Sequence, residues 1–591
     1  MDDLTIHTML SNTVKRFGNR RSLGHKKGEG YDHLTYTELM DVIQHLRRGF
    51  HHLGLKRGDR LAILSENRVE WALCDLTAQS MGVVTVPIYP TLPSNQIQYI
   101  VRDSGSRIIV VSDEKQYLKT ICLVKEVETL DKIVVMDPLP HNDAVCMKKL
   151  IEYGATGDPS DEFFSEMERA IRYDDDATII YTSGTTGEPK GVCLSHRALL
   201  HTAKAATSLI HLDETDVFLS FLPLCHIVER VAGHYLPLFI GAQIIYSEGV
   251  FAIAGELSNL KPTVFLCVPR LYENMREKIL EGVSKLPDHQ RKLFHHALNL
   301  GYRKTESLQK GKGLNPAVSL QHHLADRLIL SKVREKATGG RTRFFVSGGA
   351  PLNPRTCAFF QALGVDILEG YGLTEFPVIS VNRPGKIRSG SVGERLPDIE
   401  VRISEEGEIL ARGPSRMRCY LGLDQETNTA IDAEGWFHTG DIGKLDSDGY
   451  LYITDRIKDI IVLANGKKVA PQPIEAMLKE SPLIAEIVLL GDEQNTIMAL
   501  ILPAFDNLTD WANKFHINYN DLHELVTNSE VKRLYKQEID RLSDSLADFE
   551  RIKRFALLET PFTIETGELT PTLKVKRKVI AEKFSELIKS M

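Results

Sequence analysis

The chain has 591 residues, 42% of them hydrophobic and 26% charged, and a formal net charge of −7. This length and composition exclude a small disulfide-stapled peptide and a chain that is disordered throughout, and they predict roughly four domains or subdomains. Lys and Arg number 72 against 79 Asp and Glu, so the basic excess typical of a dedicated nucleic-acid-binding protein is absent.

Short apolar runs alternate with helical patterns from residue 60 to about residue 349. Eight of these runs predict strands, at residues 60–67, 83–89, 107–113, 132–137, 217–224, 242–248, 262–268 and 342–349. Runs of Val and Ile between amphipathic helices are typical of parallel sheets that are covered on both faces. The pattern predicts an α/β fold whose large N-terminal domain, residues 1–455, holds two stacked α/β subdomains.

A helical insert with a basic surplus is predicted over about residues 271–341. From Arg270 to Arg343 the sequence has 16 Lys or Arg and 7 Asp or Glu, an excess of 9 basic residues in an otherwise acidic chain. Two interpretations stay open: a solvated helical face, or a surface that meets anionic lipid or an anionic substrate.

Two smaller units follow the insert. Short strands with Gly and Asp turns from about residue 385 to residue 455 predict a small, barrel-like β unit. Strands and helices in a compact pattern then predict a small, mobile α+β C-terminal domain over residues 456–591.

The eight cysteines are scattered, with no CxxC pair and no zinc-ligand spacing, which is typical of reduced thiols in a cytosolic protein. The N-terminal residues lack the basic and apolar regions of a secretory signal. No stretch reaches about 18 uninterrupted apolar residues, so no transmembrane helix is expected. We therefore expect a cytoplasmic protein.

The strongest local signal is a glycine-rich loop in ATIIYTSGTTGEPKGVCLSH, residues 177–196. An apolar run leads into a set of small and hydroxyl residues that ends in a lysine: Thr182, Ser183, Gly184, Thr185, Thr186, Gly187 and Lys190. Glycine permits backbone conformations closed to other residues, and hydroxyls, backbone N–H groups and a lysine together can surround a polyphosphate. A Walker A loop needs G-x-x-x-x-G-K-[ST], whereas here two residues separate Gly187 from Lys190 and Gly191 follows, so a conventional P-loop fold is disfavoured.

The loop resembles the phosphate loop of the adenylate-forming superfamily: acyl-CoA synthetases, firefly luciferase and the adenylation domains of peptide synthetases. Six further segments are similar to the family's motifs and occur in the same order, at residues 221–230, 345–352, 368–375, 436–441, 455–475 and 567–577. The resemblance implies a reaction in two halves. A carboxylate first attacks the α-phosphate of ATP to give an acyl-adenylate and pyrophosphate, and the thiol of CoA then attacks the adenylate and releases AMP.

The resemblance also implies roles for individual residues. The phosphate loop with Lys190 would hold the β- and γ-phosphates, Thr374 would offer its hydroxyl to the α-phosphate, and Glu375 with Thr182 would form part of a Mg²⁺ shell. Adenine would lie among the residues of two segments, Gly349, Ala350, Pro351, Glu369, Gly370, Tyr371 and Gly372. Asp441 would accept hydrogen bonds from the ribose hydroxyls, and Arg456 would support the ribose or a phosphate.

Three further residues complete the implied machinery. Lys574 would offset the charge that develops during adenylation, although its LTPTLK context departs from the SGK ending of short-chain enzymes and is similar to long-chain enzymes. Lys458 falls on the hinge about which the C-terminal domain would rotate between the half-reactions. His226 would lie beside the acyl carboxylate, with a hydrogen-bonded core histidine as the alternative.

The pattern His226-x-x-Glu229-Arg230 and the segment 268–275 resemble long-chain acyl-CoA synthetases, and the apolar segment 233–246 is expected to line an acyl tunnel. We predict an AMP-forming long-chain fatty acid–CoA ligase, a carbon–sulfur bond-forming enzyme that uses ATP, Mg²⁺ and CoA. Three alternatives stay open: an acyl-AMP ligase that serves a carrier protein, a ligase for a medium-chain, branched or aryl acid, and a non-catalytic binding protein on the same fold. The expected partners are small molecules and not nucleic acid, with a peripheral contact to the inner face of a membrane through the basic insert and a homodimer left open.

Overall fold

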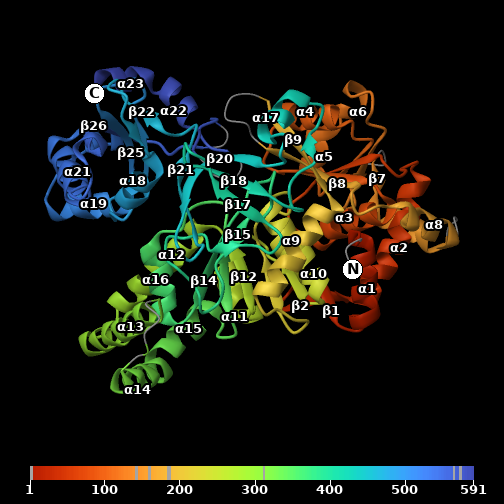
Figure 1. The fold of residues 1–591 in the computed structure, drawn as a ribbon, viewed down its shortest axis with the longest axis horizontal. Coiled ribbons are helices and arrows are strands. Elements are labelled where there is room, and N and C mark those ends of the chain that lie inside the picture. The colour runs from red at the N-terminus through yellow and green to blue at the C-terminus, as the bar shows by residue number, and fades with distance from the viewer. Residues whose placement is uncertain are drawn as a thin grey trace.

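The computed structural model describes residues 4–139, 144–156, 161–182, 188–249, 251–309, 313, 315–563, 566–570 and 575–591. Two large sheets with helices around them make up most of the molecule, and the C-terminal residues form a separate body at the upper left of Figure 1. The predicted α/β class, with two subdomains and a distinct C-terminal domain, is confirmed.

The first sheet has eight strands in the order β19-β9-β8-β4-β3-β5-β6-β7. Its strands are β3 (Arg60–Leu64), β4 (Val84–Ile88), β5 (Ile108–Val111), β6 (Lys132–Val135), β7 (Val145–Cys146), β8 (Asp176–Thr182), β9 (Lys190–Ser195) and β19 (Cys419–Tyr420). The strands from β8 to β7 run parallel, whereas β8, β9 and β19 pair antiparallel at one edge. The predicted strands in this region are all present, and the antiparallel edge adds to them.

The second sheet has nine strands in the order β16-β15-β14-β13-β12-β10-β11-β1-β2. Its strands are β1 (Arg21–Lys27), β2 (Gly30–Thr35), β10 (Val217–Ser220), β11 (Gln243–Tyr246), β12 (Val264–Cys267), β13 (Phe344–Ser347), β14 (Asp366–Tyr371), β15 (Ser380–Val381) and β16 (Glu394–Arg395). The central strands are parallel, and short antiparallel pairs close both edges.

Helices cover these sheets. They are α1 (Ile6–Phe17), α2 (Tyr36–His52), α3 (Val69–Met81), α4 (Ser94–Ser104), α5 (Glu114–Thr120), α6 (Leu123–Glu126), α7 (Met147–Thr156), α8 (Asp161–Ala170), α9 (His196–Leu209), the π-helix η1 (Glu229–Tyr235), α10 (Leu236–Ile240), α11 (Ile253–Leu260) and α16 (Pro354–Leu363). Local sequence fixes their ends: Thr35 and Glu38 form a capping box at the start of α2, and Gly82 adopts positive φ at the end of α3.

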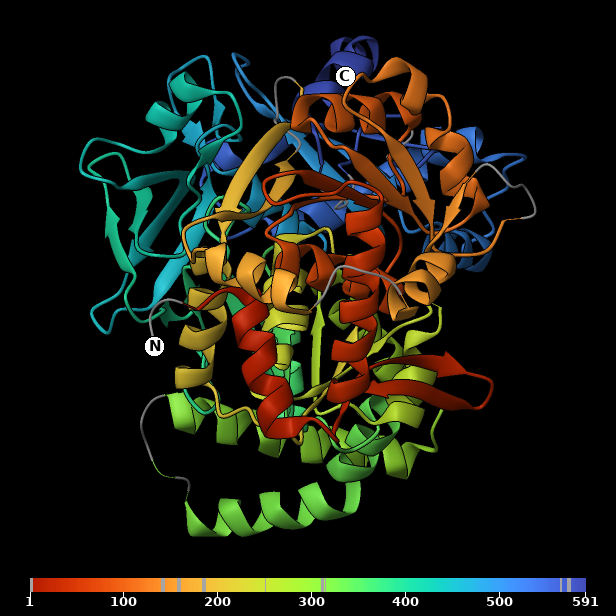
Figure 2. The ribbon, with the colours of Figure 1, turned by 90° about the vertical axis from the view of Figure 1, so that its right-hand side faces the viewer.

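The crossover from β12 to β13 carries the predicted helical insert. It consists of α12 (Pro269–Ser284), α13 (Asp288–Gln309), α14 (Pro316–Ala325), the π-helix η2 (Asp326–Leu330) and α15 (Ser331–Thr338). In Figure 1, α13, α14 and α15 lie at the lower left of the molecule, and α12 lies above them. Green helices of this part of the chain form the lower end of Figure 2. None of the helices in the described ranges combines the length and the apolarity needed to cross a bilayer.

A four-stranded antiparallel sheet follows, in the order β17-β18-β20-β21. It contains β17 (Glu400–Ile403), β18 (Glu408–Arg412), β20 (Phe437–Leu445) and β21 (Leu451–Arg456), with α17 (Asp424–Ala430) between β19 and β20. It is smaller than the expected β unit, because β16 and β19 belong to the two large sheets.

The C-terminal residues have apolar cores of their own, made only of residues from Ile461 onward. Their strands are β22 (Ile461–Val462), β23 (Lys468–Val469), β24 (Ile484–Leu490), β25 (Ile497–Pro503) and β26 (Ile552–Leu557). Their helices are α18 (Pro471–Leu478), α19 (Phe505–Lys514), α20 (Leu522–Thr527), α21 (Ser529–Leu542), the 3-10 helix η3 (Asp548–Glu550), α22 (Arg577–Lys583) and α23 (Ser585–Ser590).

A buried polar network joins η1 to the first sheet and to α3. Arg230 on η1 pairs with Asp75 on α3, and both side chains are fully buried. Its guanidinium also donates to Thr178 Oγ1 on β8 at 2.9 Å and to Tyr235 Oη at 3.1 Å. Because a buried charge is tolerated only when it is paired and hydrogen-bonded, these groups tie η1 to the first sheet.

A second buried carboxyl, Glu229, has fewer partners. Its Oε1 accepts a hydrogen bond from Ser220 Oγ at 2.6 Å, and its Oε2 has no partner in the described chain. Burial raises the pKa of Glu229 to about 8. The carboxyl therefore keeps its proton at neutral pH in the folded protein.

Glu229 should make the fold less stable as pH rises. Its folded-state pKa of about 8 lies above the value of about 4.3 in an unfolded chain, so its contribution is complete below about pH 4.3 and is lost toward pH 8. Between pH 6 and pH 8 we expect a loss of about 2–3 kcal/mol. Glu229→Gln cannot ionise and should remove this loss in urea unfolding, whereas the exposed Glu405→Gln should not. Equal pH slopes in wild type and Glu229→Gln would contradict the prediction.

Candidate active site

The tyrosine of the GYGLTE segment and the aspartate of the WFHTGD segment are in direct contact. Tyr371, at the end of β14, donates from Oη to Asp441 Oδ2 at 2.6 Å, and Arg456 donates from Nε to Asp441 Oδ1 at 2.7 Å. The register of β20 and β21 places Asp441 opposite Arg456. Three residues expected around adenine and ribose therefore meet, although Tyr371 lies far from the other two in the sequence.

The electrostatics of this trio follow from its burial. Burial, together with the negative charge of Asp441, raises the pKa of Tyr371 well above its ordinary value. Burial lowers the pKa of Arg456, but the Asp441 carboxylate more than offsets this and raises it overall. Tyr371 therefore stays neutral and Arg456 stays charged, so the trio presents a fixed set of one carboxylate, one hydroxyl and one guanidinium.

The two ends of the expected phosphate loop are paired. Thr182, the last residue of β8, lies opposite Lys190, the first residue of β9. Ser183, Gly184, Thr185, Thr186 and Gly187 lie outside the described residues. The Lys190 ammonium lies 5.3 Å from the centre of the Tyr420 ring and 3.9 Å from Glu426 Oε1.

Tyr420 connects this lysine to the expected metal ligand. It lies on β19, which pairs with β9, and its Oη donates to Glu375 Oε1 at 2.8 Å. The backbone N–H of Met417 also donates to the Glu375 carbonyl at 2.7 Å. Lys190 and Glu375 therefore contact the same aromatic side chain, Lys190 near its ring and Glu375 at its hydroxyl. Tyr420 lies in no motif that the sequence pointed to, and only the pairing of β19 with β9 reveals it.

The carboxylate of Glu375 and the hydroxyl of Thr182 are oxygen groups of the kind that Mg²⁺ takes from proteins. Among the described residues no group of three or more His, Cys, Asp or Glu side chains is placed to hold a metal. Mg²⁺ usually takes one or two carboxylates and fills its other positions with water and substrate phosphates.

The two segments that we expect to bind adenine lie side by side, because β13 and β14 are neighbouring parallel strands. Gly349 has a φ of +82°, and a Cβ on Gly372 would lie 2.1 Å from the Pro377 carbonyl, so both positions need glycine. Ala350 and Pro351, by contrast, are exposed. Thr374 is half-buried in the turn that follows Gly372.

Glu369 is a buried acid beside these glycines. Burial raises its pKa to about 8, only partly offset by a hydrogen bond from the Leu352 N–H. Its Oε1 has no partner in the described chain. A buried oxygen without a partner can accept a hydrogen bond from a ligand, as the expected role near adenine requires.

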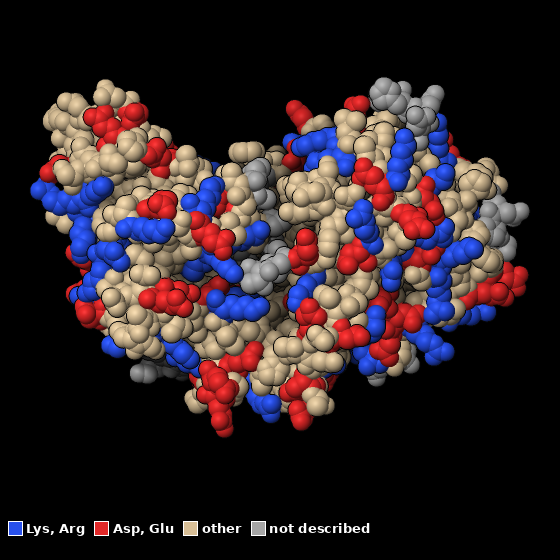
Figure 3. All heavy atoms as spheres, turned by 90° about the horizontal axis from the view of Figure 1, so that it is seen from above, with Lys and Arg blue, Asp and Glu red and all other residues tan. Residues whose placement is uncertain are grey.

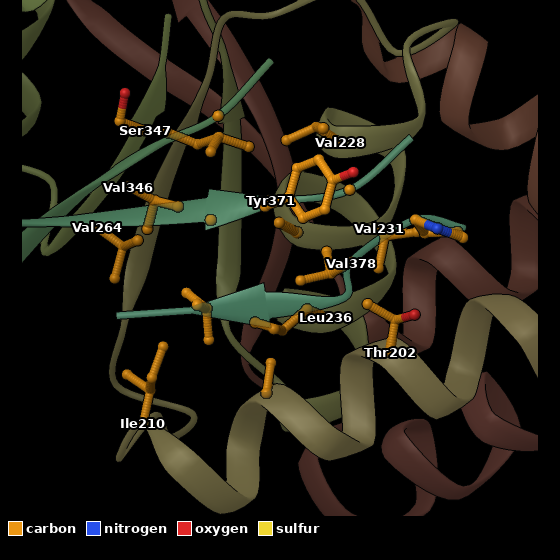
Figure 4. A pocket seen from close by; sticks show the side chains of 18 of the residues that line it. Thr202, Ile210, Val228, Val231, Leu236, Val264, Val346, Ser347, Tyr371 and Val378 are labelled. Atoms are coloured by element: carbon orange, nitrogen blue, oxygen red, sulfur yellow. The ribbon is translucent and has the colours of Figure 1, made fainter. Parts of the chain in front are cut away.

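An apolar pocket runs from Tyr371 into the second sheet (Figure 4). The cavity has a volume of about 80 Å³ and opens to solvent. Tyr371 and Val228 lie at one end and Ile210 at the other, with Val231 and Val264 between them. Its polar side chains are Thr202, Ser347 and Tyr371.

His226 and the segment 233–246 lie apart from most of this lining. His226 is half-buried, accepts a hydrogen bond from the Val228 N–H at 3.3 Å, and does not line the pocket. Within the segment 233–246 only Leu236 lines it. His234 and Tyr235 are buried beside Asp75 instead, so most of this segment serves the core.

The C-terminal body borders a hollow on the upper face of the molecule, with Lys and Arg side chains along its left wall (Figure 3). Lys458 is exposed in the turn between β21 and β22. Lys574 lies outside the described residues. Arg355 on α16 forms an ion pair with Glu480 of the C-terminal body at 2.6 Å.

Comparison with known proteins agrees with these observations. Residues 10–421 match the AMP-binding enzyme family model, and residues 458–591 match its AMP-binding enzyme C-terminal domain. The long-chain-fatty-acid–CoA ligase FadD15 of Mycobacterium tuberculosis is 33% identical over 94% of this chain and 92% of its own length. The peroxisomal long chain acyl-CoA synthetase 6 of Arabidopsis thaliana is 33% identical over 100% of this chain and 86% of its own length.

Solved structures share the fold. The anthranilate CoA ligase AuaEII in complex with anthranoyl-AMP superposes with a TM-score of 0.75 at 20% identity, covering 100% of this chain and 99% of that one. A fatty acyl CoA synthetase of Mycobacterium tuberculosis superposes with a TM-score of 0.64 at 20% identity, with 99% of each chain covered. The family model matches more than half of this chain, and relatives are 33% identical over most of it. The chain therefore belongs to the AMP-binding enzyme family.

Proposed function

We propose that this protein is an ATP-dependent long-chain fatty acid–CoA ligase that forms an acyl-adenylate and then an acyl-CoA. The apolar pocket carries the proposal, because it begins at Tyr371, on the nucleotide side, and continues between aliphatic side chains. Burying each methylene of an acyl chain contributes about 0.8 kcal/mol, so an apolar lining of this kind favours acids with a hydrocarbon chain over a short acid such as acetate. Full-length relatives named as long-chain ligases support the same substrate class.

The first half-reaction would occur where the pocket meets the nucleotide site. Tyr371 and Glu369 would hold adenine, and Asp441 with Arg456 would hold the ribose. Lys190 and the loop that precedes it would hold the phosphates, since a carboxylate can approach ATP only where positive charge offsets the repulsion between the two anions. Mg²⁺, held by Glu375 and Thr182, would neutralise part of the phosphate charge.

The remaining roles concern the acyl group and the C-terminal body. Thr374 would orient the α-phosphate, His226 would lie close to the acyl carboxylate, and Lys574 would stabilise the charge of the adenylation transition state. Rotation about Lys458 would then admit CoA for thioester formation.

The direct test combines two assays over acids from acetate to oleate. Fatty-acid-dependent exchange of pyrophosphate into ATP measures adenylation, and consumption of free CoA thiol measures the second half-reaction. We expect both activities, with the highest kcat/KM for long-chain acids. Exchange without CoA consumption would indicate a ligase that serves another acceptor, and the absence of exchange would refute the proposal.

Lys458→Pro should slow thioester formation at least tenfold more than adenylation. The Lys458 N–H donates to no described partner, so proline removes no backbone hydrogen bond of this conformation. It does fix φ at this residue and restrict Ile457, which limits rotation at the hinge. Separate single-turnover measurements of acyl-adenylate formation and of its reaction with CoA would show the difference. Equal losses in both half-reactions would contradict a hinge at this position.

A further inference from the structure

The outermost helix of the basic insert exposes a row of leucines. Within the described residues α14 buries no side chain, and it lies at the lower end of the molecule in both ribbon views (Figures 1 and 2). Leu320, Leu324 and Leu328 are 62%, 51% and 61% exposed. We call these three residues the leucine face. A contiguous exposed apolar patch on a soluble domain usually marks an interaction surface.

The spacing of the leucine face matches the backbone. Leucines four residues apart on an α-helix lie on the same side, with a drift of about 40° per step because a turn has 3.6 residues. Leu328 lies in the π-helical segment η2, whose wider turn offsets that drift. The π segment therefore helps to keep the three leucines in one row.

Basic side chains border this row. Arg327 and Lys332 are exposed on the same continuous helix, and Arg303 and Lys304 are exposed on α13, against which α14 packs. None of the four forms an ion pair with a described residue, although the charge of Lys304 acts on the carboxyls of Asp326 and Asp366. Arg334, on the same helix, is paired with Asp326. An apolar row with basic borders is the pattern by which amphipathic helices lie in the interface of an anionic bilayer.

We propose that the leucine face docks this protein on the surface of an anionic lipid bilayer. The charges favour a bilayer over a second copy of the chain, because two such faces in contact would bring like charges together. The bilayer can also supply substrate. The insert joins β12 to β13, and Val264 on β12 and Val346 on β13 both line the apolar pocket. This link to substrate supply rests on the proposed function, whereas the docking does not.

Vesicle sedimentation with the full-length protein tests the proposal. Wild type should bind vesicles made of phosphatidylcholine and phosphatidylglycerol in a two-to-one ratio, and it should bind pure phosphatidylcholine weakly. Leu320→Ser/Leu324→Ser/Leu328→Ser should lower the partition coefficient on the order of tenfold or more. Arg327→Glu/Lys332→Glu should abolish the preference for the anionic vesicles.

A matched control removes three leucines that are exposed elsewhere. Leu118→Ser/Leu445→Ser/Leu522→Ser should leave vesicle binding unchanged. CoA consumption with a fatty acid dissolved in detergent should be equal in all variants, so that loss of activity and loss of docking are read separately. Failure of wild type to bind anionic vesicles would overturn the proposal. So would equal binding by the leucine-face variant, or a dimer in sedimentation velocity that only this variant dissociates.

Discussion

Asp441→Asn should lower kcat/KM for ATP by about two orders of magnitude, with most of the change in KM. Asp441 accepts hydrogen bonds from both Tyr371 and Arg456, one on each carboxylate oxygen. An asparagine keeps one acceptor oxygen and presents an NH₂ group in place of the other. Hydrogen bonds to a charged group contribute about 1.5–3 kcal/mol each, and the half-buried Arg456 guanidinium would lose the counter-charge of Asp441.

Pyrophosphate exchange at varied ATP concentrations gives both constants. Tyr371→Phe is the matched control, because it removes one hydrogen bond and keeps the carboxylate. It should lower kcat/KM for ATP on the order of tenfold. Thermal unfolding of each variant separates a folding defect from a binding defect. An unchanged KM for ATP in a well-folded Asp441→Asn protein would remove Asp441 from the nucleotide site.

The strands that the sequence predicted are those that are buried on both faces. Runs such as RLAIL (Arg60–Leu64) and VFLC (Val264–Cys267) have no polar interruption, so local composition is sufficient to recognise them. The strands β1 and β2 were not predicted, because RSLGHKK and GYDHLT carry neither an apolar run nor strict alternation. β1 is placed by its parallel pairing with β11, which lies far along the chain.

The candidate site shows the same division. Tyr371, Asp441 and Arg456 could be predicted, because each lies in a segment with a local signature that resembles the family, and the structure brings the three together. Tyr420 could not be predicted, because its CYLG segment resembles no motif of the family. Its role arises from a strand pairing that brings it to Lys190 from a distant part of the sequence. Contacts of this kind depend on the tertiary fold alone.

The same reasoning explains why the segment 233–246 was expected to line the pocket and mostly does not. An apolar run predicts burial, but burial in a core and burial along a cavity have the same composition. Tyr235 is apolar in pattern, yet its hydroxyl donates to Asp75 Oδ2 at 2.7 Å in the buried network. The charged partners that decide its place lie on another element, α3.

Asp75→Ala should destabilise the N-terminal part of the chain by about 3–5 kcal/mol, the largest effect on stability that we expect from one substitution. Burial alone would raise the pKa of Asp75, but Arg230, together with His234 and Tyr235, more than offsets this and holds the pKa at about 2. Since that value lies below about 3.9, the pair stabilises the fold above about pH 4, and the contribution is lost as pH falls toward 2. At neutral pH, removal of Asp75 leaves Arg230 buried with only neutral partners.

Trp71 offers a local probe, because its ring lies 5.3 Å from the Arg230 guanidinium. In a Trp436→Phe/Trp511→Phe background it is the only remaining tryptophan, so its fluorescence in urea reports unfolding around the buried pair. Asp75→Leu/Arg230→Met is the informative partner variant, because it removes both charges and leaves none unpaired. A buried ion pair can fix how two elements meet without adding much stability. In that case the double variant should be more stable than Asp75→Ala by about 2 kcal/mol or more. A single Asp75→Ala variant within about 1 kcal/mol of wild type would mean that water or a rearranged side chain reaches Arg230, and that the network is less closed than its contacts indicate.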